Sequence, residues 1–294
     1  MKRIVLTGAT GFLGSHLLRA MVKQGFQVVI LKRSSSDTWR INDLLPNIEA
    51  YDIDHVALEE AFSKRKVDAV IHTACAYGRL GEPLVELLEA NLLFGIRLLE
   101  ASIQFDAGAF VNTDTFFHKS QNDYSLSKHQ FTDWLAIHGK KIKIVNMTLQ
   151  NVYGHNDAIT KFVPWLLEQF GKNVDSIPLS AGSQRRDFIY VDDVVSAYLL
   201  TIKNINTFRE YTNVNVGTGD LVTVRHFIEQ MSSCYRATYP GCNVQLGFGK
   251  LPIKDGEISC IAPNIEKLKC LGWKVSGNLK TNIKKLIEES IRNG

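Results

Sequence analysis

A glycine-rich stretch near the start of this chain has the spacing needed to bind a phosphate group. Gly8, Gly11 and Gly14 directly follow an apolar run at 4–6 and open an amphipathic stretch. Such a turn lets the backbone approach a pyrophosphate, and the free N–H groups of the following helix bind the anion. A glycine triplet can also simply start a helix, so the rest of the chain has to support the site. The predicted dinucleotide contacts in this stretch are Gly8, Thr10, Gly11, Phe12, Leu13 and Gly14.

A second group of residues has the types needed for proton transfer. Tyr124 and Lys128 share one face of a predicted helix because they are four residues apart. The ordinary pKa of a tyrosine is about 10, and a nearby ammonium group favours the phenolate. We therefore expect Lys128 to lower the pKa of Tyr124 and to hold the ribose of the cofactor. Thr113 ends the preceding predicted strand, where its hydroxyl either binds a substrate carbonyl or satisfies its own backbone.

The elements that must position these residues alternate between strand and helix. Apolar runs predict strands at 26–31, 48–53, 67–73, 109–113 and 143–147, and helical patterns cover 56–64, 83–105, 124–138 and 158–170. This alternation predicts an α/β fold, a Rossmann doubly wound parallel sheet with a second, smaller α/β substrate-binding lobe. We expect 187–190 and 213–216 to return as strands to the same sheet. The predicted cofactor domain comprises 1–152 and 187–217, and the lobe comprises 153–186 and 218–294.

Composition excludes several other classes of protein. The 294 residues carry a net charge of only +4 and no basic run with interleaved aromatics, so we expect no nucleic-acid partner. No apolar segment has the length of a signal peptide or a membrane span, which predicts a cytoplasmic protein that does not bind membranes. The five cysteines form no Cys-x-x-Cys pair and the eight histidines show no ligand spacing, so we expect no metal site.

The end of the second predicted strand discriminates between the two nicotinamide cofactors. NAD needs an acidic residue there for its ribose hydroxyls, whereas this chain has Lys32, Arg33 and Ser34. Two cations and a hydroxyl suit a 2′-phosphate, although such residues also occur in solvated surface turns. We therefore expect NADP(H) and consider NAD(H) less favoured.

Together, the glycine motif, Thr113, Tyr124 and Lys128 resemble the extended short-chain dehydrogenase/reductase family, the NAD-dependent epimerases and dehydratases of nucleotide sugars. The resemblance implies a homodimer formed through the helices at 83–105 and 124–138. It also implies that Arg186, together with Lys254, binds the diphosphate of the substrate. Other implied cofactor contacts are Asp52, Ile53, Thr73, Ala74, Ala76, Gln150, Asn151 and Val152. Further implied substrate contacts are Asn91, Asp114, Asn151, Lys161 and Phe162.

Within that family, the segments at 112–117, 161–164 and 184–188 are similar to those of the CDP-abequose and CDP-paratose synthases. This similarity implies NADPH-dependent reduction of the 4-keto group of a CDP-linked 4-keto-6-deoxyhexose, in deoxysugar biosynthesis such as that of O-antigens. Thr115 stands where the family's dehydratases carry a glutamate, which disfavours dehydration. Asp114 is a residual proton donor or, as we favour, a polar loop residue. The alternatives are an epimerase of the same fold, a non-catalytic NADP-binding sensor and a reductase of small ketones.

Overall fold

The computed structural model describes residues 2–79, 81–252 and 262–292, which form two compact units. The first unit comprises Met1–Leu149, Val195–Val216 and Lys267–Trp273, and the second comprises Gln150–Val194, Gly217–Glu266 and Lys274–Gly294. Each unit therefore contains segments that lie far apart in the sequence.

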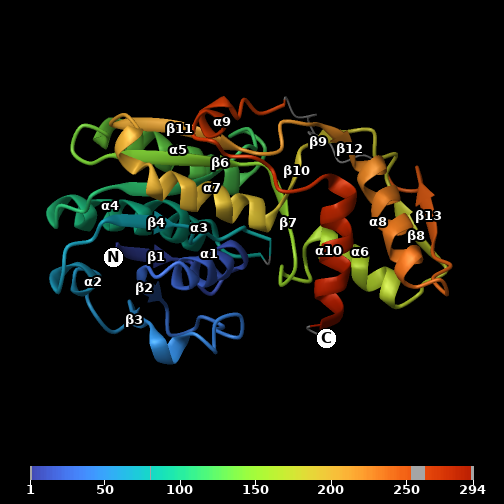
Figure 1. Cartoon of the computed structure of the whole chain (residues 1–294), viewed down its shortest axis with the longest axis horizontal. Helices are drawn as coiled ribbons and strands as arrows, with labels where there is room; N and C mark the ends of the chain where they lie inside the picture. Colours follow the sequence, from blue (N-terminus) through green and yellow to red (C-terminus); the bar gives the residue numbers. More distant parts are fainter. Residues whose placement is uncertain (1, 80, 253–261, 293–294) are drawn as a thin grey trace. The chain divides into compact units, whose positions relative to one another are not determined.

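A seven-stranded parallel sheet organises the first unit (Figure 1). Its strand order is β11-β6-β5-β4-β1-β2-β3, so the chain winds outward in both directions from β1. This order confirms the predicted doubly wound sheet. In chain order the strands are β1 (Arg3–Thr7), β2 (Gln27–Lys32), β3 (Glu49–Asp52), β4 (Ala69–His72), β5 (Phe110–Thr115), β6 (Ile144–Leu149) and β11 (Tyr211–Val216).

Helices cover both faces of this sheet because its strands are apolar on both sides. One face packs against α2 (Glu60–Ser63), α4 (Phe94–Gln104) and α5 (Asp123–His138), whose buried side chains include Phe62, Leu98 and Phe131. The other face carries α1 (Phe12–Lys23) and α7 (Val191–Lys203) (Figure 1). The remaining short helices of this unit are η1 (Leu45–Asn47), η3 (Ile205–Thr207) and α9 (Glu266–Cys270).

The predicted helix at 83–105 consists of three consecutive segments. It starts as α3 (Leu84–Leu88), continues as a π-helical turn, η2 (Glu89–Leu93), and ends as α4. Turns of this kind are rare and often occur at functional sites. Asn91, one of the predicted substrate contacts, lies in η2 and is completely buried.

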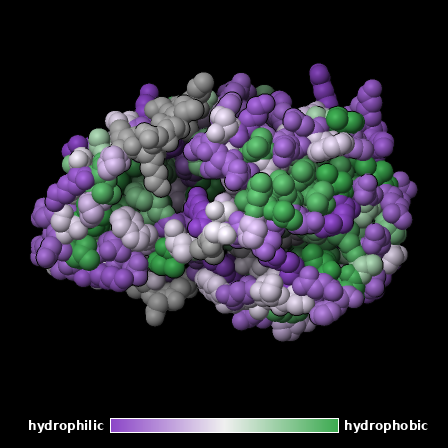
Figure 2. Space-filling model, turned by 180° about the vertical axis from the view of Figure 1, so that it is seen from behind, coloured by the Kyte–Doolittle hydropathy of each residue, from purple (hydrophilic) through white to green (hydrophobic). Residues whose placement is uncertain are grey.

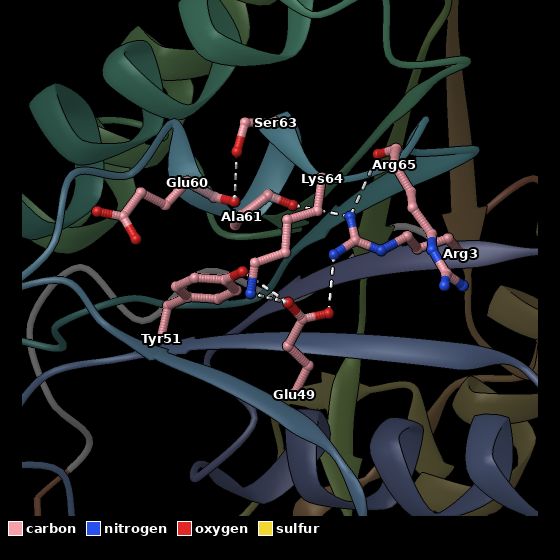
Figure 3. A network of polar contacts seen from close by, with 8 residues as sticks. All are labelled: Arg3, Glu49, Tyr51, Glu60, Ala61, Ser63, Lys64 and Arg65. Carbon is pink, nitrogen blue, oxygen red and sulfur yellow. Dashed lines mark hydrogen bonds and ion pairs between the residues drawn. The ribbon is translucent and has the colours of Figure 1, made fainter.

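A polar network fixes the outer strand β3 to β1 and α2 (Figure 3). The guanidinium of Arg3 is paired with Glu49 at 2.9 Å and donates a hydrogen bond to the carbonyl oxygen of Ala61 at 2.9 Å. Tyr51 and Lys64 also donate to the carboxylate of Glu49, at 2.6 and 3.2 Å. Burial raises the pKa of Glu49, but the hydrogen bonds from these three partners outweigh it and lower the pKa to about 2.

The second unit contains short strands in pairs, each forming a sheet of its own. We had predicted that residues 187–190 return to the main sheet, and this prediction is wrong, because β10 pairs with β7. Of the two predicted segments, 213–216 joins the main sheet, as part of β11. The strand pairs are β10 (Phe188–Tyr190) with β7 (Asn151–Tyr153), β12 (Val222–Thr223) with β9 (Arg185–Arg186) and β13 (Gln245–Phe248) with β8 (Ser176–Leu179). Its helices are α6 (Phe162–Gly171), α8 (Val224–Thr238) and α10 (Leu279–Arg292).

Candidate active site

The glycine turn between β1 and α1 has the shape of a phosphate cradle. A Cβ atom on Gly14 would lie 2.0 Å from the carbonyl oxygen of Gly8, so only glycine allows this approach of helix to turn. Gly8 itself has a φ of +70°, in the left-handed region that favours glycine. No side chain caps α1 at Gly11, and Phe12 and Leu13 are partly exposed at the helix start. The N-terminal end of α1 therefore fits a pyrophosphate.

The end of β4 is tied to the same turn. The hydroxyl of Thr73 donates to the carbonyl oxygen of Thr7 at 2.7 Å, and the amide of Ala74 donates to the hydroxyl of Thr7 at 3.3 Å. His72 lies 2.8 Å from that hydroxyl and is completely buried. Burial lowers the pKa of His72 well below its usual value, and the positive charge of Lys128 lowers it further. A neutral His72 thus helps to fix Thr73 and Ala74 against the glycine turn.

The end of β2 differs in charge from what its own residues predict. The register of the sheet places Asp52 of β3 opposite Lys32, at 3.4 Å, and Ile53 donates its amide to the carbonyl oxygen of Lys32. The hydroxyl of Ser34 donates to Asp52 at 2.9 Å, and its amide donates to Asp54 at 2.8 Å. This edge therefore carries the carboxylates of Asp52 and Asp54 in addition to the predicted cofactor contacts at 32–34. Arg33 is exposed there.

A further cation reaches the glycine turn from a segment that the sequence did not single out. The guanidinium of Arg40 donates to the carbonyl oxygen of Thr10 at 3.3 Å and lies 4.3 Å from the ring centre of Trp39. Arg19 of α1 holds the segment in place by donating to the carbonyl oxygen of Arg40 and by pairing with Asp43 at 2.6 Å. Sequence reasoning missed Arg40 because its contact with Thr10, 30 residues away along the chain, arises from folding.

Thr113 lies in β5 near its carboxyl end, whereas Tyr124 belongs to α5. The hydroxyl of Thr113 is 2.7 Å from that of Tyr198, on α7. Burial raises the pKa of Tyr198, so its phenol stays protonated, and either hydroxyl can donate this hydrogen bond. Tyr124 lies in the first turn of α5, which begins with a capping box between Asn122 and Ser125.

The pKa of Tyr124 differs from our expectation of a value lowered by lysine. Burial raises it well above its usual value, as do the nearby Cys75 and Asp114, while a hydrogen bond with Thr115 and the charge of Arg79 act in the opposite direction. Burial also lowers the pKa of Lys128, which is only 2% exposed. Burial is thus the largest contribution to the pKa shift of each group.

Asp114 is a strand residue, not the loop residue that we had favoured. It lies in β5, is buried, and its carboxylate accepts hydrogen bonds from Thr132 at 3.1 Å, from Asn146 at 3.0 Å and from the amide of Thr115 at 2.8 Å. Asn146 is also bonded to Asn112 and Asn213, so a polar ladder crosses β5, β6 and β11. Both carboxylate oxygens of Asp114 thus accept hydrogen bonds from the protein.

Asn91 also has protein partners where we expected substrate. Its amide accepts a hydrogen bond from the backbone of Ala76 at 2.7 Å and donates one back at 2.8 Å. It further donates to the hydroxyl of Ser127 at 3.0 Å, and Ser127 donates to the carbonyl oxygen of Tyr124 at 2.9 Å. Asn91 therefore connects the segment after β4, which contains the predicted cofactor contact Ala76, to the start of α5.

The remaining predicted residues lie in the second unit. Gln150 is buried, and Asn151 and Val152 lie in β7, where Asn151 donates to the carbonyl oxygen of Asp187. Lys161 pairs with Asp157 at 3.0 Å and precedes Phe162, which begins α6 and is 40% exposed. The guanidinium of Arg186 is buried and donates to the carbonyl oxygen of Arg185 at 2.9 Å. Lys254 lies outside the described residues.

The described residues contain neither a candidate metal site nor a membrane-spanning helix. Among them, no group of histidine, cysteine, aspartate or glutamate side chains could hold a metal ion. None of the helices within 2–79, 81–252 and 262–292 combines the length and the apolar character needed to span a membrane.

Comparison with known proteins identifies the family. Residues 4–217 match the NAD dependent epimerase/dehydratase family. The chain belongs to this family. It is therefore an enzyme of the oxidoreductase type that uses a nicotinamide dinucleotide, in agreement with the glycine turn described above.

Relatives within the family extend over nearly the whole chain. The CDP-abequose synthase of Salmonella typhimurium is 33% identical over 97% of both chains. A UDP-glucose 4-epimerase of Thermotoga maritima, solved with UDP-glucose, superposes with a TM-score of 0.83 at 23% identity over 99% of both chains. The UDP-glucose 4-epimerase of Thermus thermophilus, solved with NAD, has a TM-score of 0.80 at 22% identity, also over 99% of both chains. The two solved structures share the fold of this chain.

Proposed function

We propose that this enzyme acts on a nucleotide-linked sugar in deoxysugar biosynthesis and reduces the 4-keto group of a CDP-linked 4-keto-6-deoxyhexose with NADPH. The observation that carries the proposal is the 33% identity to a CDP-abequose synthase over 97% of both chains. The end of β5 supports reduction over elimination. Thr115 offers no carboxylate, and Asp114 is buried among its own hydrogen-bond donors.

The proposed mechanism assigns one task to each residue around the carbonyl oxygen at C4. A bound reduced nicotinamide supplies a hydride for C4. Tyr124 donates its proton to the oxygen and later regains one from solvent. The ordinary pKa of a tyrosine is about 10, so its phenol carries a proton at neutral pH and can donate it. Thr113 donates to the same oxygen while it accepts from Tyr198. Lys128 stabilises the negative charge that develops nearby.

We propose NADP(H) as the cofactor because of the charged side chains near the edge formed by β2 and β3. Lys32 and Arg33 equal the carboxylates of Asp52 and Asp54 in number there, and Arg40 adds a further cation at the glycine turn. A net reduction also needs a cofactor that dissociates after each turnover. The solved relative that holds NAD favours the opposite choice. Titration of the enzyme with NADPH and NADH decides between them, and tighter binding of NADH would contradict this assignment.

The substrate contacts that we propose lie in the second unit. Arg186 suits a diphosphate because a guanidinium forms two parallel hydrogen bonds with phosphate oxygens. Asn151, Lys161 and Phe162 are proposed to contact the nucleotide sugar. Arg186→Ala should raise the KM for a diphosphate-linked substrate strongly, and an unchanged KM would exclude this role.

The function is tested by offering CDP-, dTDP-, GDP- and UDP-linked 4-keto-6-deoxysugars with NADPH and following the loss of absorbance of the reduced nicotinamide. We expect the fastest consumption with the CDP-linked sugar and none after Tyr124→Phe. No consumption with any of the four would refute ketoreduction.

A second candidate, nucleotide-sugar epimerisation, is favoured by the names of the solved relatives. An epimerase returns its hydride to the sugar, so product would form without net consumption of NADPH. Conversion of a UDP-hexose at constant nicotinamide absorbance would therefore select this candidate. A non-catalytic sensor would retain its function after Tyr124→Phe.

We further propose that the enzyme is a homodimer. Exposed hydrophobic side chains lie on α3, η2 and α5, which contact one another, and Figure 2 shows hydrophobic side chains gathered in one area of the surface. An exposed apolar patch of this kind commonly marks a protein interface. Light scattering that gives the mass of a single chain would refute the dimer. The side chains concerned are Leu84, Val85, Leu93, Leu126, Trp134 and Ile137.

A further inference from the structure

Two side chains that neither the sequence analysis nor the proposed mechanism used lie beside Tyr124. The ring of Tyr77 is 5.0 Å from the ring of Tyr124, centre to centre, and the two planes are inclined by 30°. The guanidinium of Arg79 is 5.3 Å from the centre of the Tyr77 ring. Both Tyr77 and Arg79 are exposed, in the segment that follows β4. A cation and an aromatic ring therefore stand next to the proposed proton donor.

This segment is fixed to the helix that carries Tyr124. Asn91 holds Ala76 by two hydrogen bonds and reaches the carbonyl oxygen of Tyr124 through Ser127. Gly78 then turns the chain with a φ of +65°, and a Cβ atom there would lie 2.8 Å from Leu87. Because the residues on either side of Tyr77 are constrained in this way, its ring contact with Tyr124 is part of a built arrangement.

The charged and titratable groups that face Tyr124 come from three elements. Cys75 precedes the segment of Tyr77, Asp114 belongs to β5, and Lys128 lies one turn further along α5. Burial raises the pKa of Tyr124, Cys75 and Asp114 raise it further, and Arg79 lowers it. The positive charge of Arg79 thus favours the phenolate of Tyr124.

We propose that Tyr77 and Arg79 are positioning residues for Tyr124: Tyr77 orients the phenol ring by stacking, and Arg79 stabilises the phenolate that remains once the proton has been transferred. This inference rests on the proposed role of Tyr124 as proton donor. Arg79 acts through its charge, so lysine should replace it and glutamine should not. Tyr77 acts through its ring, so phenylalanine should replace it and leucine should not.

The electrostatic part is tested without turnover. Placing 3,5-difluorotyrosine at position 124 makes the phenol more acidic and lets fluorine NMR follow its titration in the full chain. Because Arg79 is exposed and partly screened by solvent, Arg79→Gln should raise this pKa by about 0.3 to 1. Arg79→Lys should leave the pKa unchanged. Lys66→Gln should also leave it unchanged, because it removes an exposed charge that precedes the start of β4, whereas Arg79 follows its end. An equal pKa in Arg79→Gln and wild type would overturn the role of Arg79.

The orienting part is tested by turnover and by the same NMR signal. Tyr77→Leu should lower kcat with the 4-keto sugar by about 3- to 10-fold and shift or broaden the fluorine resonance, whereas Tyr77→Phe should preserve both. Retention of kcat and of the resonance in Tyr77→Leu would overturn the role of Tyr77. If wild type reduces none of the sugars, the proposed function fails, while the NMR signals still decide the inference.

Discussion

Replacing Glu49 by glutamine should destabilise the fold far more than its position on an outer strand suggests. The carboxylate of Glu49 receives hydrogen bonds from Tyr51, Arg3 and Lys64, which lower its pKa from 4.5 to about 2 despite its burial. Since each unit of pKa difference corresponds to about 1.4 kcal/mol, the negative charge stabilises the folded state by at most about 3.5 kcal/mol. Solvent reaches 28% of the Glu49 side chain, and we therefore expect about 2 kcal/mol at pH 7.

The pH dependence of this effect has a definite sign. A carboxylate whose pKa is lowered by folding stabilises the protein above its unfolded-state pKa and loses that contribution as the pH falls through its folded-state pKa. The difference between wild type and Glu49→Gln should thus be complete at pH 7 and decline from about pH 4.5 toward pH 2.

Urea unfolding followed by circular dichroism at several pH values measures this difference. The matched control is Asp43→Asn, which breaks the ion pair with Arg19, whose two side chains are 59% and 45% exposed. Exposed pairs contribute about 1 kcal/mol or less, so the control should be nearly neutral. Equal losses in Glu49→Gln and Asp43→Asn, or a loss in Glu49→Gln that does not vary with pH, would refute the reasoning.

Three further predictions concern the site. Gly14→Ala places a Cβ atom 2.0 Å from the carbonyl oxygen of Gly8, so it should weaken NADPH binding at least about 10-fold in a fluorescence titration, whereas Gly241→Ala, where a Cβ atom meets open space, should not. Arg40→Gln should weaken the binding of NADPH by about 5- to 20-fold and hardly change the binding of NADH, as measured by calorimetry. Equal losses for both cofactors would show that Arg40 does not bind the 2′-phosphate. Tyr198→Phe removes the partner of Thr113 and should lower kcat about 3- to 10-fold with little change in KM, and an unchanged kcat would contradict that pairing.

The parts of the fold that sequence predicted are those encoded by local patterns. The glycine spacing before α1 and the apolar runs of β1, β4 and β5 each identify an element without reference to the rest of the chain. The three-residue strand β10 was placed in the wrong sheet because so short a segment does not specify its partner. The π-helical turn η2 was missed for a similar reason, since a helical pattern does not reveal where its hydrogen bonding changes.

The motifs of the site could be recognised from the sequence, whereas its chemistry depends on which side chains the fold brings together. The spacing of Tyr124 and Lys128 suggested a lowered pKa, yet burial of both groups decides the direction. Tyr77 and Arg79 belong to no motif, and only the folding of their segment against α5 brings them to Tyr124. Asn91 was expected at the substrate, and its complete burial assigns it to the support of the site.

The pairing of β2 with β3 has a consequence for engineering. Because the register sets Asp52 opposite Lys32, a change of nicotinamide preference requires substitutions on both β2 and β3. A library that randomised only positions 32–34 would leave the facing carboxylate in place. Co-randomising position 52 should therefore yield switched variants that the smaller library cannot contain.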